Sequence, residues 1–579
     1  MTEKSAVGSA PEPESLRRVL RERFGHGDFR GPQLQAVEAV LQGRDVLLTM
    51  PTGAGKSVVY QLPALLLPGV TLVVSPLIAL MKDQVDALAR KGIPASFVNS
   101  TLDAAERRKR LGRAARGELR LLFVTPERFR SKEFLELLPT ISVSRLAVDE
   151  AHCVSQWGHD FRPDYSRLSE YRKLLGDPPT VATTATATPQ VASDIARCLG
   201  LRDPLVLRAG IERPNLFLAA TSVEFEEQKL PLLAARVAEL PGSGIVYSAL
   251  IRDLERLHDD LARRGVPTLV YHGKLSREER ARMQERFMSS PRAVVLATNA
   301  FGMGIDRADI RFVLHAQMPR TLEAWTQEVG RAGRDGAPAW CELLYFGEDV
   351  AVQQQFVQWA NPTREFVVGV YEVLRGWGER LAVKDLSDLQ GELLTKNRSD
   401  NRLATALKWL EVLGVTEGDF ETRDLRLARE LDPGELPASV GSPEKLRADL
   451  EALLGMVRFA SGAERCRRQT LAEHFGLAAG AGPEGPCGAC DVCTDPADWR
   501  ARHFEPPRAA PASASPVEPI RGPGAFARGQ WVEVDGRHLG RIVRVEGEGR
   551  RTRLFVESAG DLQVRSVDPR RARIVEHGA

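Results

Sequence analysis

The sequence predicts an α/β protein with two tandem parallel-sheet domains, followed by a helical region, a zinc-binding element with four cysteines and a small C-terminal β-barrel. Between residues 24 and 346, short runs rich in Val, Ile and Leu alternate with longer amphipathic stretches. This alternation is typical of parallel sheets covered by helices. Four of the seven cysteines cluster late in the chain, and short alternating apolar runs follow them.

The length and composition allow several folded domains and exclude some classes of protein. The chain has 579 residues, of which 43% are hydrophobic and 27% are charged, as in ordinary globular proteins. The net charge is only +2, so any basic surface for nucleic acid must be local. No N-terminal targeting signal and no apolar run of membrane-spanning length is visible, so we expect a cytoplasmic protein without membrane contact.

The order of the apolar runs predicts two sheet domains rather than one large sheet. The runs begin at Asp45, Thr71, Leu121, Arg145, Ile245 and Ala293. The segment 208–215 separates the first four runs from the last two. We therefore predict one domain at 1–207 and a second at 208–350.

The pattern changes to helices after Pro362. One face of the segment 401–413 carries leucines at helical spacing: Leu403, Leu407, Leu410 and Leu413. A turn-rich segment with short apolar alternation follows at 415–427. Helices followed by a hairpin predict a winged helix at 363–432, and a plain helical connector is the alternative.

Three further segments are predicted in the C-terminal part. We place the zinc-binding element at 440–497 and a flexible linker at 498–522, because Pro and Ala dominate the linker without periodicity. Short alternating runs with glycines between them predict an SH3-like β-barrel at 523–579. The last 59 residues, 521–579, hold twelve Arg against eight Asp or Glu. The barrel therefore either binds DNA or a partner protein, or is a cap with a solvated surface.

A glycine-rich loop follows the first apolar run. Its sequence is TGAGKS: Thr52, Gly53, Ala54, Gly55, Lys56 and Ser57. Backbone N–H groups of such a loop surround phosphates, while the lysine neutralises the β- and γ-phosphates and the serine hydroxyl ligates Mg²⁺. The general pattern has a glycine where this chain has Met50, so the match is to a shorter form. The loop predicts that ATP and Mg²⁺ are cofactors.

Two adjacent carboxylates, Asp149 and Glu150, end the apolar run that begins at Arg145. Asp149 is suited to hold Mg²⁺, and Glu150 to polarise the attacking water. Helix capping or simple exposure is the alternative, but it leaves the distance from the glycine-rich loop unexplained. The pair therefore predicts ATP hydrolysis.

A third motif, QEVGRAGR, lies at 327–334 in the second block. Arginines from a neighbouring domain can stabilise charge on the γ-phosphate. Arg331 and Arg334 are three residues apart, so we expect them to share one helical face and to point across a cleft with Gln327. The alternative is a solvated helix surface, but Gly330 and Gly333 weaken an ordinary helix.

The late cysteines predict a structural zinc site. Cys487, Cys490 and Cys493 lie in one short loop, and Cys466 lies upstream in an expected helix. Four cysteinates form a closed tetrahedral Zn²⁺ site. Disulfides are the alternative, which the expected cytoplasmic location disfavours. The neighbouring Arg467 and Arg468 either face nucleic acid or cap the helix.

Taken in order, these motifs resemble superfamily 2 helicases, and among them the RecQ family. The resemblance spans residues 24–336, about 300 residues, and the zinc region. It rests on FGHGDFRGPQ, TGAGKS, SPLIALMKDQV, TPE, DEAHCVSQWGHDFRPDY, TTATA, ATNAFGMGID and QEVGRAGRDG, and later on CRRQTLAEHFG and CGACDVC. It implies that both sheet domains are RecA-like.

The resemblance also implies further nucleotide contacts. Gln33 and Arg30 stand where the family recognises adenine, and His26 replaces the aromatic ring that usually stacks on the base. Gly31-Pro32 inverts the usual order of those two residues. In ATNAFGMGID, Gly304 and Asp306 stand at positions that contact the nucleotide.

SQWGHDFR, at 155–162, is similar to the family's aromatic-rich loop, which couples DNA binding to hydrolysis. We expect its DNA-binding residues to be Ser155, Gln156, Trp157, His159, Phe161 and Arg162. Aromatic rings can stack on bases and the arginine can bind a phosphate. Core packing of the two aromatic residues is the alternative.

The expected function is that of an ATP-dependent DNA helicase in repair or recombination. Movement 3′→5′ on single-stranded DNA is carried over from the resemblance alone. Expected partners are single-stranded and branched or partly duplex DNA, together with single-strand-binding or repair proteins. The alternatives are an RNA helicase, a translocase that does not unwind, or a DNA-binding regulator with a decayed motor. About 130 residues separate Gly336 from Cys466, whereas in many relatives zinc follows the motor closely and precedes the winged helix.

Overall fold

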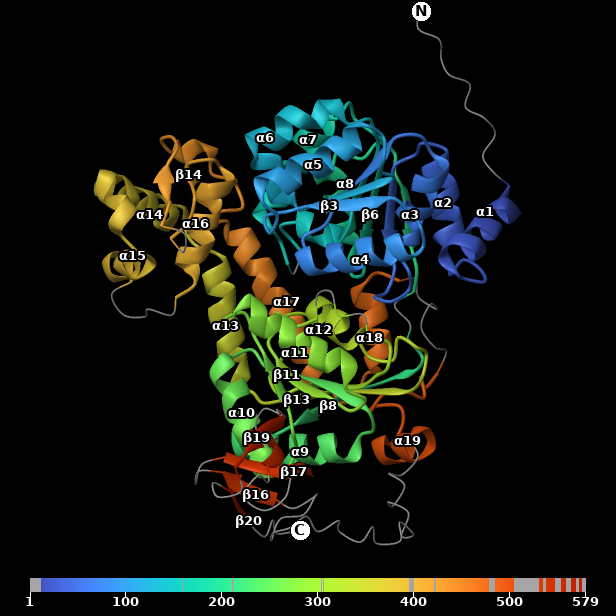
Figure 1. Ribbon diagram of the computed structural model, residues 1–579, viewed down its shortest axis with the longest axis vertical. Coiled ribbons are helices and arrows are strands. Elements are labelled where there is room, and N and C mark those ends of the chain that lie inside the picture. Colours follow the sequence, from blue (N-terminus) through green and yellow to red (C-terminus); the bar gives the residue numbers. More distant parts are fainter. Residues whose placement is uncertain are drawn as a thin grey trace, which may run out of the picture.

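The structure is a computed structural model. The residues it describes are 12–158, 160–210, 213–302, 305, 307–394, 400–420, 423–477, 485–504, 531–534, 538–546, 553–558, 564–568 and 572–574. Figure 1 shows the first sheet domain above the second, with a helical region beside the first.

The first domain is a seven-stranded sheet in the order β3-β4-β2-β5-β6-β1-β7, and all of its neighbouring strands are parallel. The strands are β1 (Val46–Thr49), β2 (Val70–Val74), β3 (Ala95–Val98), β4 (Leu121–Val124), β5 (Val143–Val148), β6 (Thr180–Thr184) and β7 (Leu205–Arg208). Successive residues of β2 enter opposite cores, Leu72 on one face and Val73 on the other. Both faces are therefore covered, as parallel sheets require.

The helices of the first domain follow its strands in alternation. They are α1 (Pro13–Val19), η1 (Leu20–Phe24), α2 (Gln33–Leu41), α3 (Val58–Leu66), α4 (Ile78–Arg90), α5 (Ala104–Ala115), α6 (Lys132–Leu137), α7 (Leu168–Leu174) and α8 (Pro189–Cys198). Short 3₁₀ turns are η2 (Pro126–Arg130), η3 (Leu138–Thr140), η4 (Ala151–Val154) and η5 (Pro163–Arg167).

The second domain is a six-stranded parallel sheet in the order β10-β11-β9-β12-β13-β8. Its strands are β8 (Leu216–Ser222), β9 (Ser243–Tyr247), β10 (Leu269–Tyr271), β11 (Val294–Ala297), β12 (Ile310–His315) and β13 (Ala339–Tyr345). Its helices are η6 (Glu226–Gln228), α9 (Lys229–Glu239), α10 (Ile251–Arg263), α11 (Arg277–Ser289), α12 (Leu322–Val329) and α13 (Asp349–Ala360). The two sheets confirm the predicted α/β class with two tandem RecA-like domains.

The helical region follows α13. It contains α14 (Arg364–Trp377), η7 (Gly378–Val383), α15 (Leu386–Leu393), α16 (Arg402–Val412) and an antiparallel pair of short strands, β14 (Thr416–Glu417) and β15 (Arg426–Leu427). Of the four leucines predicted on one face of α16, Leu403 and Leu410 are buried, and Leu407 and Leu413 are partly buried. The winged-helix assignment of 363–432 stays a prediction.

The zinc element, which we define as residues 443–493, packs on the second domain. After the short 3₁₀ turn η8 (Pro433–Glu435) come α17 (Pro443–Ser461) and α18 (Arg467–His474). Residues of both helices, such as Met456 and Leu471, belong to one continuous core with β8 and β13. This element therefore has no separate core of its own.

The predicted linker is wrong at its start. Residues 496–503 form helix α19 (Pro496–His503), and Trp499 is only 2% exposed. Its ring lies 5.0 Å from that of Phe217 and 6.0 Å from that of Trp340 between ring centroids. One buried aromatic residue anchors this short helix, and no apolar periodicity announces it. Residues 505–522 of the predicted linker lie outside the described residues.

The described C-terminal residues form a five-stranded antiparallel sheet in the order β19-β18-β17-β16-β20. Its strands are β16 (Trp531–Val534), β17 (His538–Glu546), β18 (Arg553–Ser558), β19 (Val564–Val567) and β20 (Ala572–Ile574). Its small core includes Val532, Ile542 and Leu554. Closure into a barrel stays a prediction. Among the helices described here, none is both long and apolar enough to cross a membrane.

Candidate functional site

A cleft of about 840 Å³ lies between the two sheet domains. The first domain lines it with the glycine-rich loop and both acidic residues, and the second with residues after β11 and around the end of α12. The predicted residues that line it are Thr52, Gly53, Gly55, Lys56, Ser57, Asp149, Glu150, Gln327, Arg331 and Arg334. The structure thus brings together residues from three motifs that lie far apart in the sequence.

The glycine-rich loop connects β1 to α3. Gly53 and Gly55 have φ angles of 80° and 86°, a left-handed conformation that glycine adopts without strain. A side chain at Gly53 would also lie 3.2 Å from Cγ of Arg334. The N-terminus of α3 follows Ser57 directly, and no side chain caps it, so its N–H groups favour an anion such as phosphate.

Gln33 is buried against this loop. Its amide Nε2 donates hydrogen bonds to the carbonyl oxygens of Ala54 and Gly55, at 3.0 and 2.9 Å. Its side-chain oxygen accepts from the backbone N–H of Arg30 at 2.8 Å. The predicted adenine-recognition segment is therefore fastened to the phosphate loop by one residue.

His26 and Arg30 are exposed and are not among the described residues that line the cleft. Partial burial, followed by the positive charges of Lys91 and Arg30, lowers the pKa of His26. A lowered pKa favours the neutral imidazole, the form that stacks on a base without carrying charge.

The acidic pair follows directly after β5. Asp149 is buried, and its carboxylate accepts hydrogen bonds from the hydroxyl of Thr183 at 2.9 Å and from the backbone N–H of Glu150 at 3.0 Å. Burial and then the charge of Glu150 raise the pKa of Asp149. Glu150 has φ +48°, a strained left-handed conformation for a non-glycine residue. Its Oε1 lies 4.0 Å from Nζ of Lys56.

Several side chains around this pair were not identified from the sequence. The hydroxyl of Tyr60 lies 3.5 Å from Oδ2 of Asp149. Nδ1 of His152 lies 3.0 Å from the hydroxyl of Thr184 and 3.4 Å from Oε2 of Glu150. The threonines belong to the TTATA motif on β6, the strand next to β5. Thr183 and Thr184 end the strand next to β5, and that position is the signal that could have identified these two threonines.

The expected common helical face of the two arginines is wrong. Helix α12 ends at Val329, and both arginines lie in the turn 330–337 that follows, which we call the arginine turn. Arg331 is 5% exposed and donates to the carbonyl of Gly302, while Arg334 donates to the carbonyl of Ile305 at 2.9 Å. Glycines at 330 and 333 end the helix early, so the turn rather than a helical face directs both side chains to the cleft.

The aromatic-rich loop continues from the acidic pair toward the helical region. Trp157 is partly buried against the core of the first domain. The ring of Phe161 lies 5.9 Å from that of Trp409 on α16. Arg162 pairs with Asp160 at 3.2 Å and donates to the carbonyl of Pro76 at 3.3 Å.

The other predicted loop residues have different positions. Ser155 is buried and accepts from the backbone N–H of Trp157 at 3.2 Å. Gln156 lines a cavity of about 420 Å³ between this loop and the helical region. Three predicted site residues lie outside the described residues: His159, Gly304 and Asp306.

The four late cysteines meet at one point. The sulfur atoms of Cys466, Cys487, Cys490 and Cys493 all lie within 4.8 Å of one another, and those of Cys466 and Cys490 are 4.0 Å apart. A tetrahedral Zn²⁺ with Zn–S bonds of about 2.3 Å needs sulfurs about 3.8 Å apart, so the residues fit the ion.

This zinc knuckle, residues 487–493, is attached to the edge of the second sheet. Leu218 of β8 donates to the carbonyl of Ala489 at 3.1 Å and accepts from the backbone N–H of Asp491 at 3.0 Å. Arg467 binds both carboxylate oxygens of Asp491, at 2.9 and 3.0 Å. Arg468 donates to backbone carbonyls of the second domain. Both arginines therefore make hydrogen bonds within the protein, and Arg467 is buried.

Known families match the chain in the same order. Residues 30–195 match the DEAD/DEAH box helicase family, 228–336 the helicase conserved C-terminal domain, and 420–494 the RecQ zinc-binding family.

Curated relatives cover much of the same region. The chain is 43% identical over 342 residues to ATP-dependent DNA helicase RecQ of Bacillus subtilis (strain 168), covering 59% of this chain and 58% of the relative. It is 39% identical over 367 residues to Probable ATP-dependent DNA helicase RecS of the same organism, covering 63% and 74%. For ATP-dependent DNA helicase Q5 of Rattus norvegicus the identity is 43% over 357 residues, covering 58% and 36%. The chain thus spans less than two thirds of the length of the RecQ relative from Bacillus subtilis and of the Q5 relative from Rattus norvegicus.

The three family matches cover, in turn, the first half of the cleft, its second half and the cysteine cluster. The RecS relative is matched over about three quarters of its length. This chain belongs to the RecQ family of ATP-dependent DNA helicases.

Proposed function

We propose that this protein is an ATP-dependent DNA helicase that moves 3′→5′ along single-stranded DNA and unwinds duplex. One observation carries the proposal: the arginine turn of the second domain lies over the phosphate loop of the first, with Arg334 close to Gly53. Motion between the two domains would therefore assemble or open the hydrolytic site. That is the coupling a translocating motor needs.

In this proposal Lys56 neutralises the β- and γ-phosphates, and Ser57 and Asp149 hold Mg²⁺. Both oxygen-bearing side chains line the same cleft, and hard cations prefer oxygen ligands. When bound, Mg²⁺ supplies charge neutralisation at the phosphates. Glu150 orients and polarises the attacking water, and its strained backbone keeps the carboxylate near Lys56.

Arg331 and Arg334 act from the opposite wall. Phosphoryl transfer develops negative charge on the γ-phosphate, and a fixed arginine stabilises that charge without reorganisation. Arg334 is the one placed over the phosphate loop, whereas Arg331 is held deeper by Gly302. We therefore assign Arg334 as the arginine that reaches the γ-phosphate, with Arg331 and Gln327 supporting it.

DNA would act on hydrolysis through the aromatic-rich loop. The loop leaves Glu150 through η4 and returns beside α16, where Phe161 meets Trp409. A side chain at Gly158 would clash with the carbonyl of His152, so the loop is tightly fitted to the acidic pair. A strand that displaces this loop would therefore change the position of Glu150.

The finer parts of the proposal rest on family membership. They are the 3′→5′ polarity, a role in repair or recombination, a preference for single-stranded and branched or partly duplex DNA, and partners such as single-strand-binding proteins. A cytoplasmic location belongs to the same finer parts of the proposal.

The test is DNA-stimulated ATPase and unwinding, compared with Lys56→Ala. The variant should lose at least about 10³-fold in ATPase while DNA binding persists, since the lysine stabilises phosphate charge. Lys132→Ala, at the exposed start of α6, is the matched control and should behave as the parent does. Stimulation by RNA in place of DNA would favour an RNA helicase. Hydrolysis without strand separation, on forked, gapped and four-way substrates, would favour a translocase that does not unwind.

A further inference from the structure

The arginine turn is held by a residue from outside its own helix and strand. Arg213 lies in the segment between β7 and β8. Its Nη2 donates to the carbonyl oxygens of Ala332 and Gly333, both at 2.7 Å, and its Nη1 to that of Gly330 at 3.2 Å. The same Nη1 makes a long contact of 3.5 Å with the carbonyl of Thr52 in the phosphate loop. One guanidinium thus touches both halves of the nucleotide site.

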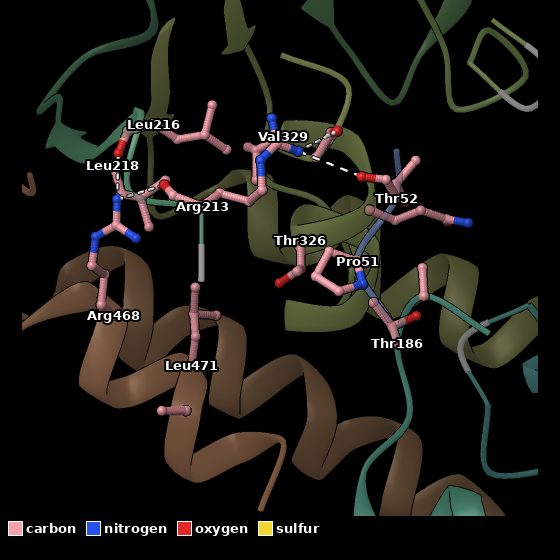
Figure 2. Close-up of a pocket in the computed structure, with 14 residues that line it drawn as sticks. Pro51, Thr52, Thr186, Arg213, Leu216, Leu218, Thr326, Val329, Arg468 and Leu471 are labelled. Atoms are coloured by element: carbon pink, nitrogen blue, oxygen red, sulfur yellow. Dashed lines mark hydrogen bonds between the residues drawn. The ribbon is translucent and has the colours of Figure 1, made fainter. Parts of the chain in front are cut away.

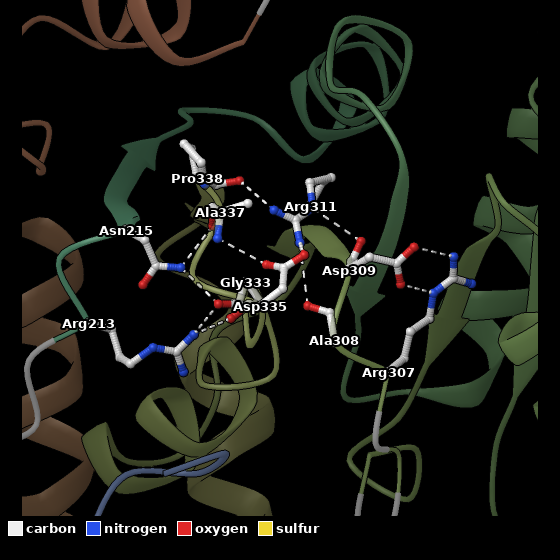
Figure 3. A network of polar contacts seen from close by, with 11 residues as sticks. Arg213, Asn215, Arg307, Ala308, Asp309, Arg311, Gly333, Asp335, Ala337 and Pro338 are labelled. Atoms are coloured by element: carbon white, nitrogen blue, oxygen red, sulfur yellow. Dashed lines mark hydrogen bonds and ion pairs between the residues drawn. The ribbon is translucent and has the colours of Figure 1, made fainter. Parts of the chain in front are cut away.

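A neighbouring side chain strengthens this attachment. Asn215 donates to the carbonyls of Gly333 and Ala337, both at 2.8 Å (Figure 3). Gly333 has φ +55°, and a side chain there would clash with the amide of Asn215. The glycine at 333 therefore leaves the space in which residues 213–215 pack against the turn.

The far end of the turn has its own anchors within the second domain. Arg311 pairs with Asp335 at 2.5 Å and donates to the carbonyl of Pro338 at 3.1 Å (Figure 3). Residues 335–338 are consequently fixed to β12. At the end nearest Arg331 and Arg334, the backbone N–H of Gly333 donates to the carbonyl of Ile310 at 2.8 Å, and the carbonyl oxygens of the turn accept from Arg213.

Arg213 is in turn fixed by the zinc element. Nη2 of Arg468 donates to the carbonyl of Arg213 at 2.8 Å and to that of Leu216 at 2.6 Å. Arg468 is two residues from Cys466, at the first turn of α18. Figure 2 shows Arg468 reaching from this helix to the segment that carries Arg213.

These contacts surround a small apolar cavity of about 50 Å³. Pro51, Thr52 and Thr186 of the first domain line one part of it, and Leu216, Val329 and Leu471 are among the residues that line the rest (Figure 2). The first domain, the second domain and the zinc element therefore meet behind the phosphate loop. Helix α18 contributes Leu471 to this cavity and Arg468 to the segment that carries Arg213.

We propose that Arg468 and Arg213 are positioning residues through which the zinc element sets the place of Arg334 over the phosphate loop. This inference rests on the proposed function. It gives the zinc element a part in hydrolysis that is separate from folding. A small displacement of a catalytic group lowers the rate strongly, by up to about 10²-fold for 1 Å.

The experiment compares Arg213→Ala and Arg468→Ala with the parent at saturating DNA. We expect kcat for ATP to fall by about 10- to 100-fold for Arg213→Ala and by about 3- to 10-fold for Arg468→Ala. Affinity for MgADP should stay within about twofold, because uniform binding is untouched. Affinity for MgADP–aluminium fluoride, which mimics the transferred phosphoryl group, should fall by about the same factor as kcat.

A double-mutant cycle shows whether the effect passes through the arginine turn. In an Arg334→Ala background, adding Arg213→Ala or Arg468→Ala should lower kcat by less than about twofold. Equal factors with and without Arg334 would overturn the inference. Arg465→Ala, an exposed arginine of the same element that pairs with Glu473, is the control and should change nothing.

Stability and zinc content separate positioning from loss of fold. Both variants should keep four thiolates bound to zinc and the parent's melting temperature to within a few degrees. If Arg213→Ala does not fold, Arg468→Gln is tested in its place. Glutamine keeps a hydrogen-bond donor at position 468, so kcat should fall by less than it does in Arg468→Ala. A parent without DNA-stimulated ATPase would refute the proposed function and the inference together. An active parent matched by both variants would refute only the inference.

Discussion

The two halves of the nucleotide cleft hold their functional side chains by different means. In the first domain, Asp149 is held by the hydroxyl of Thr183 on the adjacent strand and by the backbone N–H of Glu150. In the second, the arginine turn is held by Arg213, and Arg213 by Arg468. These two contacts of Asp149 come from an adjacent strand and from the next residue, whereas the contacts of the second half span 119 and 255 positions of sequence.

This difference teaches that the first half-site is organised by its own sheet, while the second requires parts added after it. Hydrogen bonds to a buried carboxylate fix an acid locally. The arginine turn follows the end of α12, and three of its carbonyl oxygens accept hydrogen bonds from the side chain of Arg213. The predictions below test each half in turn.

The largest effect is expected for Arg334→Ala. Removing an arginine that stabilises transition-state charge should lower kcat by about 10³-fold or more, with little change in KM for MgATP. Steady-state ATPase at saturating DNA measures both constants. Arg292→Ala, exposed on the loop before β11, serves as the control. A kcat within threefold of the parent would mean that the second half-site does not contribute charge.

Cys490→Ser should affect the second half-site indirectly, because it disrupts the zinc element whose Arg468 holds Arg213. Loss of a structural metal site belongs to the changes that cost more than about 4 kcal/mol of unfolding free energy. Metal analysis should find zinc in the parent and little in the variant, and thermal unfolding should show a clear fall in Tm. Cys198→Ser, a partly buried cysteine outside the cluster, provides the comparison. A parent that contains no zinc would contradict the assignment.

Thr183→Val tests the first half-site by pH. The hydroxyl stabilises the ionised form of Asp149, so its loss should raise the pKa of that carboxyl further. The acid limb of kcat/KM should therefore move to higher pH, with activity lost earlier as the pH falls. Thr180→Val on the same strand, which does not touch Asp149, should leave the limb in place.

The smallest effect is expected from ending the chain after Pro511. Helix α19 remains, so kcat at saturating DNA should stay within about twofold of the full chain. If the C-terminal sheet binds DNA, the Kd should rise and its salt dependence flatten, because fewer phosphate contacts release fewer counterions. Ending the chain after Asp495 instead removes Trp499, and the loss of so large a buried side chain should cost about 3–5 kcal/mol. A collapse of ATPase in the chain that ends after Pro511 would show that the C-terminal sheet supports the motor.

The sequence allowed the parallel sheets and most of the cleft to be predicted because their signals are local. A glycine-rich loop or a pair of acids directly after an apolar run indicates a nucleotide site from within about ten residues of sequence. The position of Arg331 was misjudged because glycines that weaken a helix can also end it, and the turn is stabilised from outside. Trp499 gave no periodic signal, since one ring anchors the whole helix.

The contact of Arg468 with the segment before β8 could not be predicted either. It depends on how a distant helix packs, and arginines beside a zinc ligand are equally compatible with capping or nucleic-acid contact. Residues that serve long-range contacts therefore carry no local pattern.

The zinc knuckle pairs with β8, which is the last strand of its sheet. An outermost strand with free N–H and C=O groups is a template for pairing with another chain, and the apolar LFLA of β8 would favour such pairing. The knuckle occupies the amides of Leu218 and Ala220. A chain deprived of its metal would therefore tend to associate with its copies through β8, and its loss from solution would depend on protein concentration.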